Sequence, residues 1–269
     1  MKHFQFADAM FMNLPPRSVD LVFCSPPYED ARTYGLDFSF THQAWVDWAV
    51  PRFMKCLRVC KGLVAWVVEG KTRDFRWSAT PTLLMADLHR KGVNLRKPPV
   101  FHRVGIPGSG GPDWLRNDYE FIICATNGGK LPWSDNIAMG KPCGYPPGGA
   151  MSNRTADGQR RNARTGVRLS TGRPVTNIAN PGNVIKCNVG GGQMGSPLAH
   201  ENEAPFPESL AEFFIRSFCP LGGIVVDPFS GSGTTVCVAE RLGRHGMGFD
   251  VRQSQIDLGR RRLAEQQGV

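Results

Sequence analysis

Four consecutive residues near the start of the chain, Ser25-Pro26-Pro27-Tyr28, carry groups suited to chemistry. They follow a short apolar run at residues 21–24, which is typical of a buried strand. The two prolines stiffen the turn and remove two N–H donors, which leaves a hydroxyl, several carbonyls and a phenol ring. Such a set binds anions poorly and suits an exocyclic amino group, which donates hydrogen bonds. Taken alone, the segment could equally be a plain proline turn.

A glycine-rich loop at residues 228–233 follows another apolar run, which ends at Asp227. Glycines let the backbone approach a ligand closely, and the helix expected after the loop offers free N–H groups. A dinucleotide fingerprint needs a third glycine where Val236 stands, and a phosphate-binding P-loop needs a lysine where Thr234 stands. Neither phosphate interpretation fits this loop.

Two acidic residues at strand ends favour a different ligand. Asp227 would repel a pyrophosphate and attract an ammonium or sulfonium group. Asp250 ends the next expected strand, where an acid typically accepts hydrogen bonds from ribose hydroxyls. Together they predict a site for an adenosyl compound with a cationic amino-acid tail, namely S-adenosylmethionine (SAM). The alternative is a structural glycine-rich turn with two capping acids.

The elements that must position these groups alternate along the chain. Strands are expected at residues 21–24, 63–68, 119–125, 223–227 and 246–250, and helices at 42–59, 82–89, 208–218, 234–242 and 253–265. Pro51 should kink or split the first helix, because proline lacks an N–H and its ring clashes with the preceding turn. This alternation predicts an α/β fold with a doubly wound, mostly parallel sheet, in which ligands bind at the carboxyl ends of the strands.

The 269-residue chain has a net charge of +9, which favours a polyanionic partner. Residues 130–199 hold nine Lys and Arg, two Asp and 12 of the 31 glycines, so this segment has most of the excess charge and little material for a core. Two interpretations remain open for it. The segment is either a solvated, disordered insertion or an arm that neutralises the phosphates of a nucleic acid.

The cellular setting follows from what the sequence lacks. No apolar run approaches the roughly 20 residues of a membrane span, and no secretory signal is expected at the N-terminus. The eight cysteines form no Cys-x-x-Cys pair and none lies near a histidine at zinc-finger spacing. They predict reduced thiols, mostly buried, in a cytoplasmic protein without a metal site.

The tetrad Ser25-Pro26-Pro27-Tyr28, placed ahead of the loop from Phe229 to Gly233, resembles the amino-methylating, SAM-dependent DNA methyltransferases. Ser-Pro-Pro-Tyr is usual in cytosine-N4 enzymes of that family, and Asp- or Asn-Pro-Pro-Tyr in adenine-N6 enzymes. The order of tetrad, target-recognition region and SAM loop resembles the β group. Further segments that match in the family's order are residues 6–9, 28–35, 60–62, 117–121 and 200–207, with Ala7 in place of a usual glycine and Glu201 in place of a usual proline.

The resemblance implies a Rossmann-like fold in circularly permuted order. Residues 1–129 would be the catalytic half, 130–199 a basic, glycine-rich target-recognition insertion, and 200–269 the SAM-binding half. The strand that ends at Asp250 should lie beside an N-terminal strand at residues 4–8. The final helix should then pack near residue 1, with the two chain ends close together.

The resemblance also implies a role for individual residues. Catalysis is assigned to Ser25, Pro26, Pro27 and Tyr28. SAM binding is assigned to Asp8, Ala9, His200, Phe206, Pro207, Asp227, Pro228, Phe229, Gly231, Ser232, Gly233, Thr234 and Asp250. DNA binding is assigned to Arg32, Tyr34, Arg154, Arg160, Arg161, Arg164, Arg168, Arg173 and Lys186.

The implied reaction transfers a methyl group from SAM to N4 of a cytosine that has been flipped out of duplex DNA. Ser25 Oγ and the Pro26 carbonyl would accept hydrogen bonds from the amino group, and Tyr28 would stack on the base. Adenine-N6 methylation on the same scaffold is the nearest alternative. Methylation of RNA or of a protein glutamine, and a catalytically inactive DNA-binding protein, are the others.

The implied partner is double-stranded DNA, with S-adenosylhomocysteine as the second product and no metal or membrane. Relatives dimerise, so a homodimer is a candidate assembly. A restriction endonuclease acting separately is a candidate partner. The expected location is the cytoplasm, in association with the nucleoid, in a bacterial or phage-encoded system.

Overall fold

The computed structural model describes residues 2–30, 40–105, 110–143, 160–161, 168–169, 177–189, 195–202 and 204–268. These residues fall into two compact units. The first comprises Met1–Ser134 with Asn183–Val269, and the second is Asp135–Gly182. The second unit lies within the segment expected as an insertion, whereas residues 183–199 of that segment belong to the first unit.

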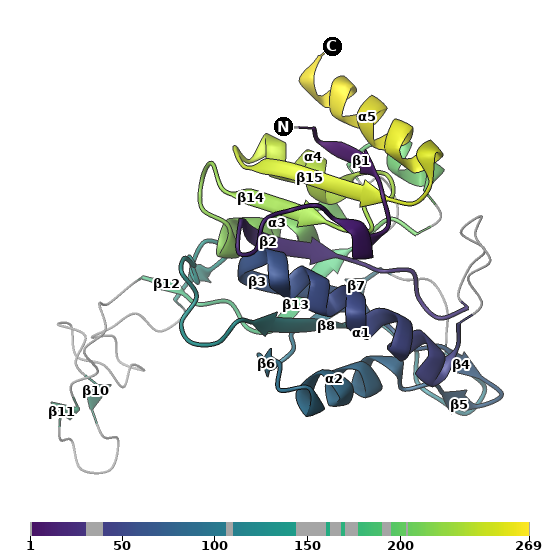
Figure 1. The fold of residues 1–269 in the computed structure, drawn as a ribbon. Helices are drawn as coiled ribbons and strands as arrows, with labels where there is room; N and C mark the ends of the chain where they lie inside the picture. Colours follow the sequence, from purple (N-terminus) through teal and green to yellow (C-terminus); the bar gives the residue numbers. More distant parts are fainter. Residues whose placement is uncertain are drawn as a thin grey trace. The chain divides into compact units, whose positions relative to one another are not determined.

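A nine-stranded sheet forms the centre of the first unit (Figure 1). Its strands, in spatial order, are β1 (Phe4–Phe6), β15 (His245–Asp250), β14 (Ile224–Asp227), β2 (Val19–Cys24), β3 (Cys60–Val68), β8 (Tyr119–Thr126), β7 (Val100–Val104) and β13 (Val184–Asn188), and β6 (Asn94–Leu95) pairs with β8. The strands from β1 to β3 are parallel, β8 is antiparallel to β3 and to β7, and β13 is parallel to β7. The expected α/β fold with a mostly parallel sheet is confirmed.

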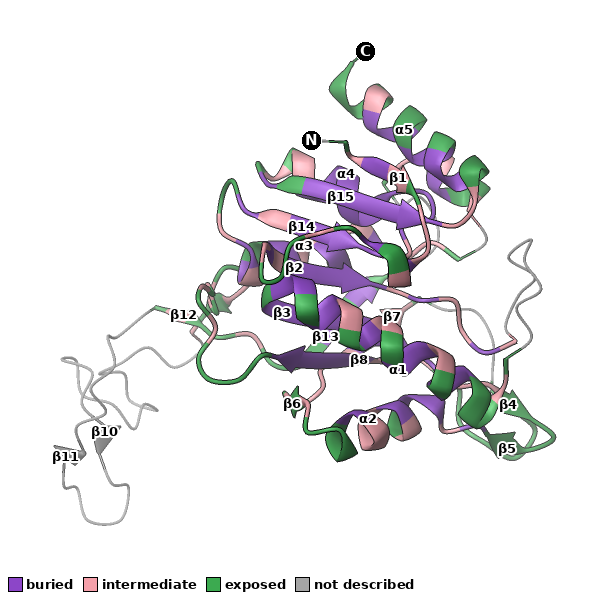
Figure 2. Ribbon diagram, viewed as in Figure 1, coloured by how far each residue is buried: buried purple, intermediate pink, exposed green. Residues whose placement is uncertain are grey.

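Helices cover both faces of this sheet because side chains alternate along its strands. On β2, Val22 and Cys24 pack into one apolar cluster with α1 (His42–Val59) and α2 (Thr80–Arg90). Leu21 and Phe23 face the opposite way, into a cluster with α3 (Glu208–Phe218) and α4 (Thr234–Arg241). Figure 2 shows the resulting burial of the central strands between exposed outer helix faces.

Pro51 does not split α1, so the expectation of a split at this residue was wrong. The helix runs without interruption over 18 residues and buries Trp45, Ala49 and Phe53 on one face. These side chains belong to the same apolar cluster as Trp66 of β3. Burial of the two large side chains, Trp45 and Phe53, contributes about 1.5–3 kcal/mol each, which together matches or exceeds the roughly 3 kcal/mol that an interior proline costs.

The expected meeting of the chain ends is confirmed. β1 pairs in parallel with β15, with Phe6 opposite Asp250. The last helix, α5 (Gln253–Gln267), packs against β1, and Phe4, Ile256 and Leu263 share a small apolar cluster. Figure 1 shows the N-terminus beside this helix. The circularly permuted order of the elements therefore closes into one sheet.

A buried arginine links the C-terminal helix to the rest of the unit. Arg262 is only 2% exposed, and it bonds Glu208 at 2.7 Å and Thr234 at 2.8 Å. We expect Arg262→Ala to lower the free energy of unfolding by about 1.5–3 kcal/mol, since it removes the buried guanidinium that bonds Glu208 and Thr234, while Arg241 still pairs with Glu208. Arg260→Ala, which removes an exposed pair with Asp257, should cost under about 1 kcal/mol. Urea denaturation of the two variants measures the difference.

Three strands of the sheet were not predicted, namely β6, β7 and β13. β7 carries His102 and Arg103, and β13 lies in the basic, glycine-rich segment. In the second unit, β9 (Lys141–Pro142) pairs with β12 (Ile178–Ala179), and β10 (Arg160–Arg161) pairs with β11 (Arg168–Leu169), both antiparallel. The first unit also has a small antiparallel hairpin of β4 (Thr72–Arg73) and β5 (Arg76–Trp77), and the 3₁₀ helices η1 (Ala9–Phe11) and η2 (Pro197–Glu201).

The eight cysteines are free thiols, and all but Cys143 are buried, as expected for small core residues. Within the described ranges, no group of three or more His, Cys, Asp or Glu side chains is arranged to hold a metal ion. No helix in those ranges combines the length and the apolar character that crossing a membrane requires.

Candidate active site

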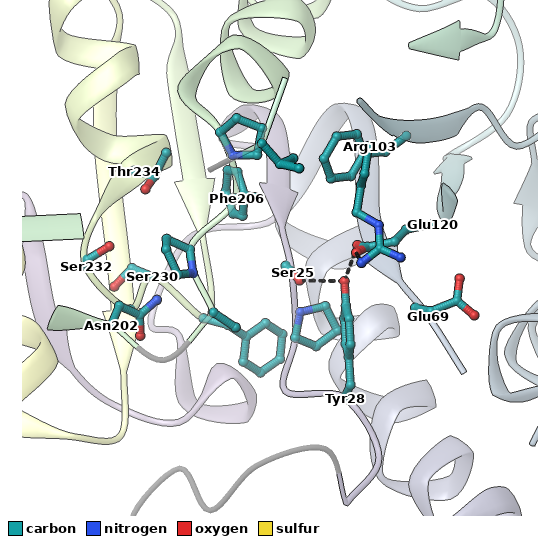
Figure 3. Close-up of a pocket in the computed structure, with 18 of the residues that line it drawn as sticks. Ser25, Tyr28, Glu69, Arg103, Glu120, Asn202, Phe206, Ser230, Ser232 and Thr234 are labelled. Atoms are coloured by element: carbon teal, nitrogen blue, oxygen red, sulfur yellow. Dashed lines mark hydrogen bonds and ion pairs between the residues drawn. The ribbon is translucent and has the colours of Figure 1, made fainter. Parts of the chain in front are cut away.

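One cavity of about 680 Å³ lies at the edge of the sheet where the parallel strands end. Ser25, Pro26 and Tyr28 line one part of it, directly after β2. Residues from the glycine-rich loop after β14 and Asp250 at the end of β15 line another part. The volume falls within the range of small-molecule sites. Two segments about 200 residues apart in the chain therefore share one cavity, as Figure 3 shows.

A chain of hydrogen bonds orders the tetrad. Ser25 Oγ donates to Tyr28 Oη at 3.3 Å, and Tyr28 Oη donates to Glu120 Oε2 at 2.6 Å (Figure 3). Trp45 Nε1 donates to the Pro27 carbonyl at 2.9 Å and fixes the turn from the side of α1. Because the single hydroxyl proton of Ser25 is directed at Tyr28, the lone pairs of Ser25 Oγ are left to accept hydrogen bonds. Ser25 Oγ can therefore act as a hydrogen-bond acceptor for a ligand in the cavity.

Two buried carboxyl groups and one guanidinium set the charge of this part of the cavity. Arg103 Nη1 lies 3.2 Å from Glu120 Oε1. Burial raises the pKa of Glu120, while the Tyr28 hydrogen bond and Arg103 oppose that rise. Burial also raises the pKa of Glu69 to about 7, although it accepts hydrogen bonds from Gly70 N and Trp77 Nε1. Both carboxyl groups line the cavity and titrate at a higher pH than an exposed glutamate.

The glycine-rich loop is held open by its own backbone conformation. Gly231 and Gly233 have φ of +46° and +81°, which favours glycine at both positions. A Cβ on Gly231 would lie 2.9 Å from Asn202 Nδ2, so a side chain there would crowd the cavity wall. Asp250 Oδ2 accepts from Gly231 N at 3.0 Å, which fixes the loop against the end of β15.

Five residues predicted to bind the cofactor do not line the cavity, and Gly233 of the glycine-rich loop is one of them. Asp227 is buried, accepts from Phe229 N at 3.0 Å, and has its pKa raised to about 7 by burial, so it shapes the loop from inside the core. Asp8 caps η1 through Met10 N at 2.7 Å and pairs with Arg52 at 2.8 Å. The others are Ala9, which is buried, and Pro228.

The cysteine next to the tetrad offers no nucleophile. Cys24 is fully buried, and burial together with Asp227 raises the pKa of its thiol well above the ordinary value. A thiol in that state does not attack a ring carbon. Ser25 and Pro26, which line the cavity beside it, carry a hydroxyl and a carbonyl that can accept hydrogen bonds, and this suits a reaction at an amino group.

A protein-family model described as DNA methylase, N6_N4_Mtase, matches residues 19–261, which is most of the chain. The chain belongs to this family. It is therefore a DNA methyltransferase of the N6/N4 class. The cavity at the ends of the parallel strands β2, β14 and β15 is its candidate active site.

Curated relatives of this DNA methyltransferase match its sequence over almost its full length. The orphan methyltransferase M.BamHII of Bacillus amyloliquefaciens is 29% identical, and the match covers 93% of this chain and 91% of that protein. The DNA adenine methyltransferase YhdJ of Escherichia coli K12 is 25% identical, over 95% of this chain and 79% of that protein.

Solved structures agree with the fold of this DNA methyltransferase. The PvuII DNA methyltransferase, described as cytosine-N4-specific, superposes with a TM-score of 0.68 at 18% identity and covers 96% of this chain and 84% of that one. The protein TTHA0409 of Thermus thermophilus in complex with SAM superposes with a TM-score of 0.62 at 22% identity, over 99% and 94%. Identities this low establish the fold alone.

The remaining residues predicted for SAM binding do line the cavity. They come from the segment around η2, from the loop after β14 and from the end of β15: His200, Phe206, Pro207, Phe229, Gly231, Ser232, Thr234 and Asp250. Among the tetrad residues, Pro27 turns away from the cavity and carries the carbonyl bound by Trp45. Of the 25 described residues that line the cavity, 11 are among the residues predicted for catalysis or SAM binding.

The residues predicted to bind DNA are only partly described. Lys186 is exposed on β13, while Arg160, Arg161 and Arg168 are placed by their backbone alone, in β10 and β11. The others lie outside the described residues: Arg32, Tyr34, Arg154, Arg164 and Arg173. Their role in DNA binding stays a prediction.

Besides Glu120, sequence reasoning missed five charged residues of the cavity: Glu29, Glu69, Lys71, Arg103 and Arg252. A signal was available for Glu69, because it ends an apolar run in the same way as Asp250 does. Arg103 had no such signal, since the strand that carries it was not recognised. Glu120 belongs to a segment that resembles the family, but its bond to Tyr28 depends on how β8 lies in the sheet.

Proposed function

We propose that this enzyme transfers a methyl group from SAM to N4 of a cytosine flipped out of duplex DNA. The observation that supports it best is the single cavity that joins the Ser-Pro-Pro-Tyr turn to the glycine-rich loop and Asp250. One end suits a planar amino-bearing base, and the other suits a nucleoside with an amino-acid tail. A base must leave the duplex to enter such a cavity, which costs a few kcal/mol.

The residues at the loop end fit SAM. Ser230 Oγ is buried and has no hydrogen-bond partner among the described residues, so a polar ligand atom would satisfy it. Gly231 leaves space that a Cβ would fill, and Asp250 presents a carboxylate at the strand end, suited to ribose hydroxyls. Bound SAM would supply an electrophilic methyl group.

Asp250→Ala should weaken SAM binding at least tenfold, because the substitution removes both the acceptor and the bond that holds Gly231. Asp257→Ala, on the exposed face of α5, is the matched control and should leave the Kd unchanged. Isothermal titration with SAM measures both. An unchanged Kd in Asp250→Ala would remove this carboxylate from the cofactor site.

The tetrad end would activate the amino group of the base. An exocyclic amino nitrogen is a weak nucleophile, because its lone pair is delocalised into the ring. Hydrogen bonds to Ser25 Oγ and the Pro26 carbonyl favour a tetrahedral nitrogen with a localised lone pair, positioned to attack the methyl carbon. The nitrogen–carbon bond would form as the sulfur–carbon bond breaks, which leaves S-adenosylhomocysteine, and the methylated nitrogen would then release one proton to solvent. Tyr28 would stack on the base, which contributes about 1–3 kcal/mol.

Nucleoside mass spectrometry of DNA treated with the enzyme tests the choice of base. We expect N4-methylcytosine. Adenine-N6 methylation is the second candidate, because the relative YhdJ is a DNA adenine methyltransferase. N6-methyladenine without the cytosine product would replace the proposal by that alternative.

Arginines of the basic segment would bind the DNA backbone. The triple variant Arg160/Arg161/Arg164→Ala should weaken DNA binding and flatten the dependence of log K on log salt by roughly 0.9 for each phosphate that is no longer neutralised. Fluorescence anisotropy at several salt concentrations measures the slope. An unchanged slope would remove these arginines from the DNA interface.

A further inference from the structure

A small hairpin stands at the rim of the active-site cavity. β3 ends at Val68, Gly70 and Lys71 line the cavity, and β4 and β5 follow at once. Figure 1 places this hairpin at the side of the sheet toward which the arrows of β2 and β15 point. The tip of the hairpin therefore lies on the same side as the groups that receive the base.

The tip carries a phenylalanine where glycine is the usual residue. The two central residues, Asp74 and Phe75, have φ of +47° and +61°, as a two-residue type I′ turn requires. Asp-Gly is a preferred pair for such a turn, because a bulky side chain at positive φ is strained. Phe75 is nevertheless 80% exposed, so the ring gains no packing in return. A strained, exposed aromatic ring points to a role outside the folded chain.

The base of the hairpin is fixed. Ser78 N donates to the Lys71 carbonyl at 2.9 Å, and Trp77 Nε1 donates to Glu69 Oε1 at 3.2 Å. A Cβ on Gly70 would lie 2.5 Å from Trp77 Nε1, so the chain packs tightly at this point. Figure 2 shows both strands of the hairpin exposed, which leaves the tip free to meet a partner.

The hairpin is also bonded to the segment that follows the tetrad. Lys71 N donates to Glu29 Oε1 at 3.0 Å, and Lys71 and Arg73 both pair with Asp30. Glu29 and Asp30 come directly after Tyr28. The position of the hairpin tip is therefore coupled to the position of the tetrad.

The charge at the tip suits a polyanion. Arg73 and Arg76 flank the turn, and Asp74 is the one acid between them. Among the described residues, Arg76 has no ion-pair partner, and it is exposed. An exposed aromatic ring beside an unpaired arginine suits the insertion of an apolar wedge between base steps while the arginine binds a phosphate.

We propose, on the basis of the methylation of duplex DNA argued above, that the β4–β5 hairpin is a DNA wedge. Phe75 enters the base stack beside the target nucleotide and stabilises the duplex from which the base has been extruded. Arg76 binds a flanking phosphate, and the bonds to Glu29 and Asp30 hold the wedge in register with the cavity.

Phe75→Gly tests the wedge, because it keeps an Asp-Gly type I′ turn and removes only the ring. Duplexes are made around a methylation site mapped with the unmodified enzyme, one fully paired and one with the target base opposite an abasic position. Phe75→Gly should slow methyl transfer on the paired duplex at least tenfold. On the abasic duplex, where little work of extrusion remains, its rate should lie within about twofold of the unmodified enzyme.

Leu221→Ala is the matched control, since Leu221 is 76% exposed in the turn before β14, at the opposite edge of the sheet. It should not change either rate, and Phe75→Gly should keep the melting temperature and the SAM affinity of the unmodified enzyme. Equal slowing on both duplexes, or no slowing on either, overturns the wedge. The wedge is also overturned if Trp114→Ala slows transfer on the paired duplex and Phe75→Gly does not. Trp114 is a second exposed aromatic side chain, 78% exposed on the β7–β8 loop, and it would then be the inserted ring. If the mapping with the unmodified enzyme finds no methylated position in duplex DNA, the proposed function itself fails.

Discussion

Ser25→Ala should lower kcat by about a hundredfold or more, comparable with the loss of one preorganised hydrogen-bonding group in other enzymes. The Ser25 hydroxyl directs its proton at Tyr28, so its lone pairs face the cavity as acceptors for the amino group of the base. An alanine leaves that amino group with one acceptor fewer at the moment its nitrogen becomes tetrahedral. Because the hydroxyl acts mainly in the transition state, Kd values for SAM and for DNA should stay within about a factor of two.

The measurement is single-turnover transfer of a labelled methyl group, with binding followed separately by titration. Ser18→Ala is the control, because Ser18 Oγ donates to the Pro15 carbonyl in a turn that does not line the cavity. It should retain full activity. Full activity in Ser25→Ala as well would mean that the Ser-Pro-Pro-Tyr turn is structural. A tenfold loss of DNA affinity would instead make Ser25 a binding group.

Much of the fold was predictable because its strands are buried on both faces. Apolar runs such as residues 63–68 stand out in the sequence, and the helices between them have one clear apolar face. β13 escaped prediction because only Ile185 and Cys187 are buried in it, and the surrounding charge and glycine mask that alternation. The pattern of exposed and buried residues along β13 is nevertheless that of a half-buried edge strand.

The site was predictable where local sequence determines it. The Ser-Pro-Pro-Tyr turn and the glycine-rich loop both carry their chemistry within a few residues, and parallel strand ends meet at one edge. Asp227 shows the limit of this reasoning. A strand-end acid can turn toward the ligand, as Asp250 does, or into the core, as Asp227 does, and the sequence does not distinguish the two.

The contact between Tyr28 and Glu120 lies beyond any local rule. These residues are 92 positions apart, and they meet because β8 inserts antiparallel between β3 and β7. The register that sets His102 opposite Tyr119 brings Arg103 to the same carboxylate. Only the order and register of the whole sheet determine this part of the site.

Tyr28→Phe should lower kcat by about tenfold to a hundredfold while it keeps the aromatic ring that stacks on the base. The phenol links Ser25 to the Glu120 carboxylate through bonds of 3.3 and 2.6 Å, and its loss frees the Ser25 proton to point elsewhere. A serine that donates into the cavity no longer accepts from the amino group. Tyr28→Ala, which also removes the ring, should show the same loss in kcat and in addition a weaker affinity for DNA.

Glu120→Gln should reduce kcat through the same chain of bonds, because the amide accepts from Tyr28 without a negative charge. The double variant with Tyr28→Phe should then be little worse than either single one, since both interrupt one unit. A coupling energy near zero would show that Glu120 acts independently of the tyrosine. Asp118→Asn is the control, as Asp118 lies on the same approach to β8 and faces His102 and Arg116.

The pH profile separates the two carboxyl groups of the cavity. Burial raises the pKa of Glu120 above its ordinary value and that of Glu69 to about 7, so each becomes protonated as the pH falls through its raised pKa. The hydrogen bonds from Ser25 through Tyr28 require Glu120 in its ionised, accepting form. We therefore expect kcat to decline on the acid side of the pH profile. Glu69→Gln removes one carboxyl group that titrates near 7, and an acid limb that persists in this variant comes from Glu120 or from Asp227, whose pKa burial also raises to about 7. That limb should disappear in Glu120→Gln. If the acid limb remains unchanged in Glu120→Gln, the ionised Glu120 carboxylate does not control whether Ser25 accepts a hydrogen bond.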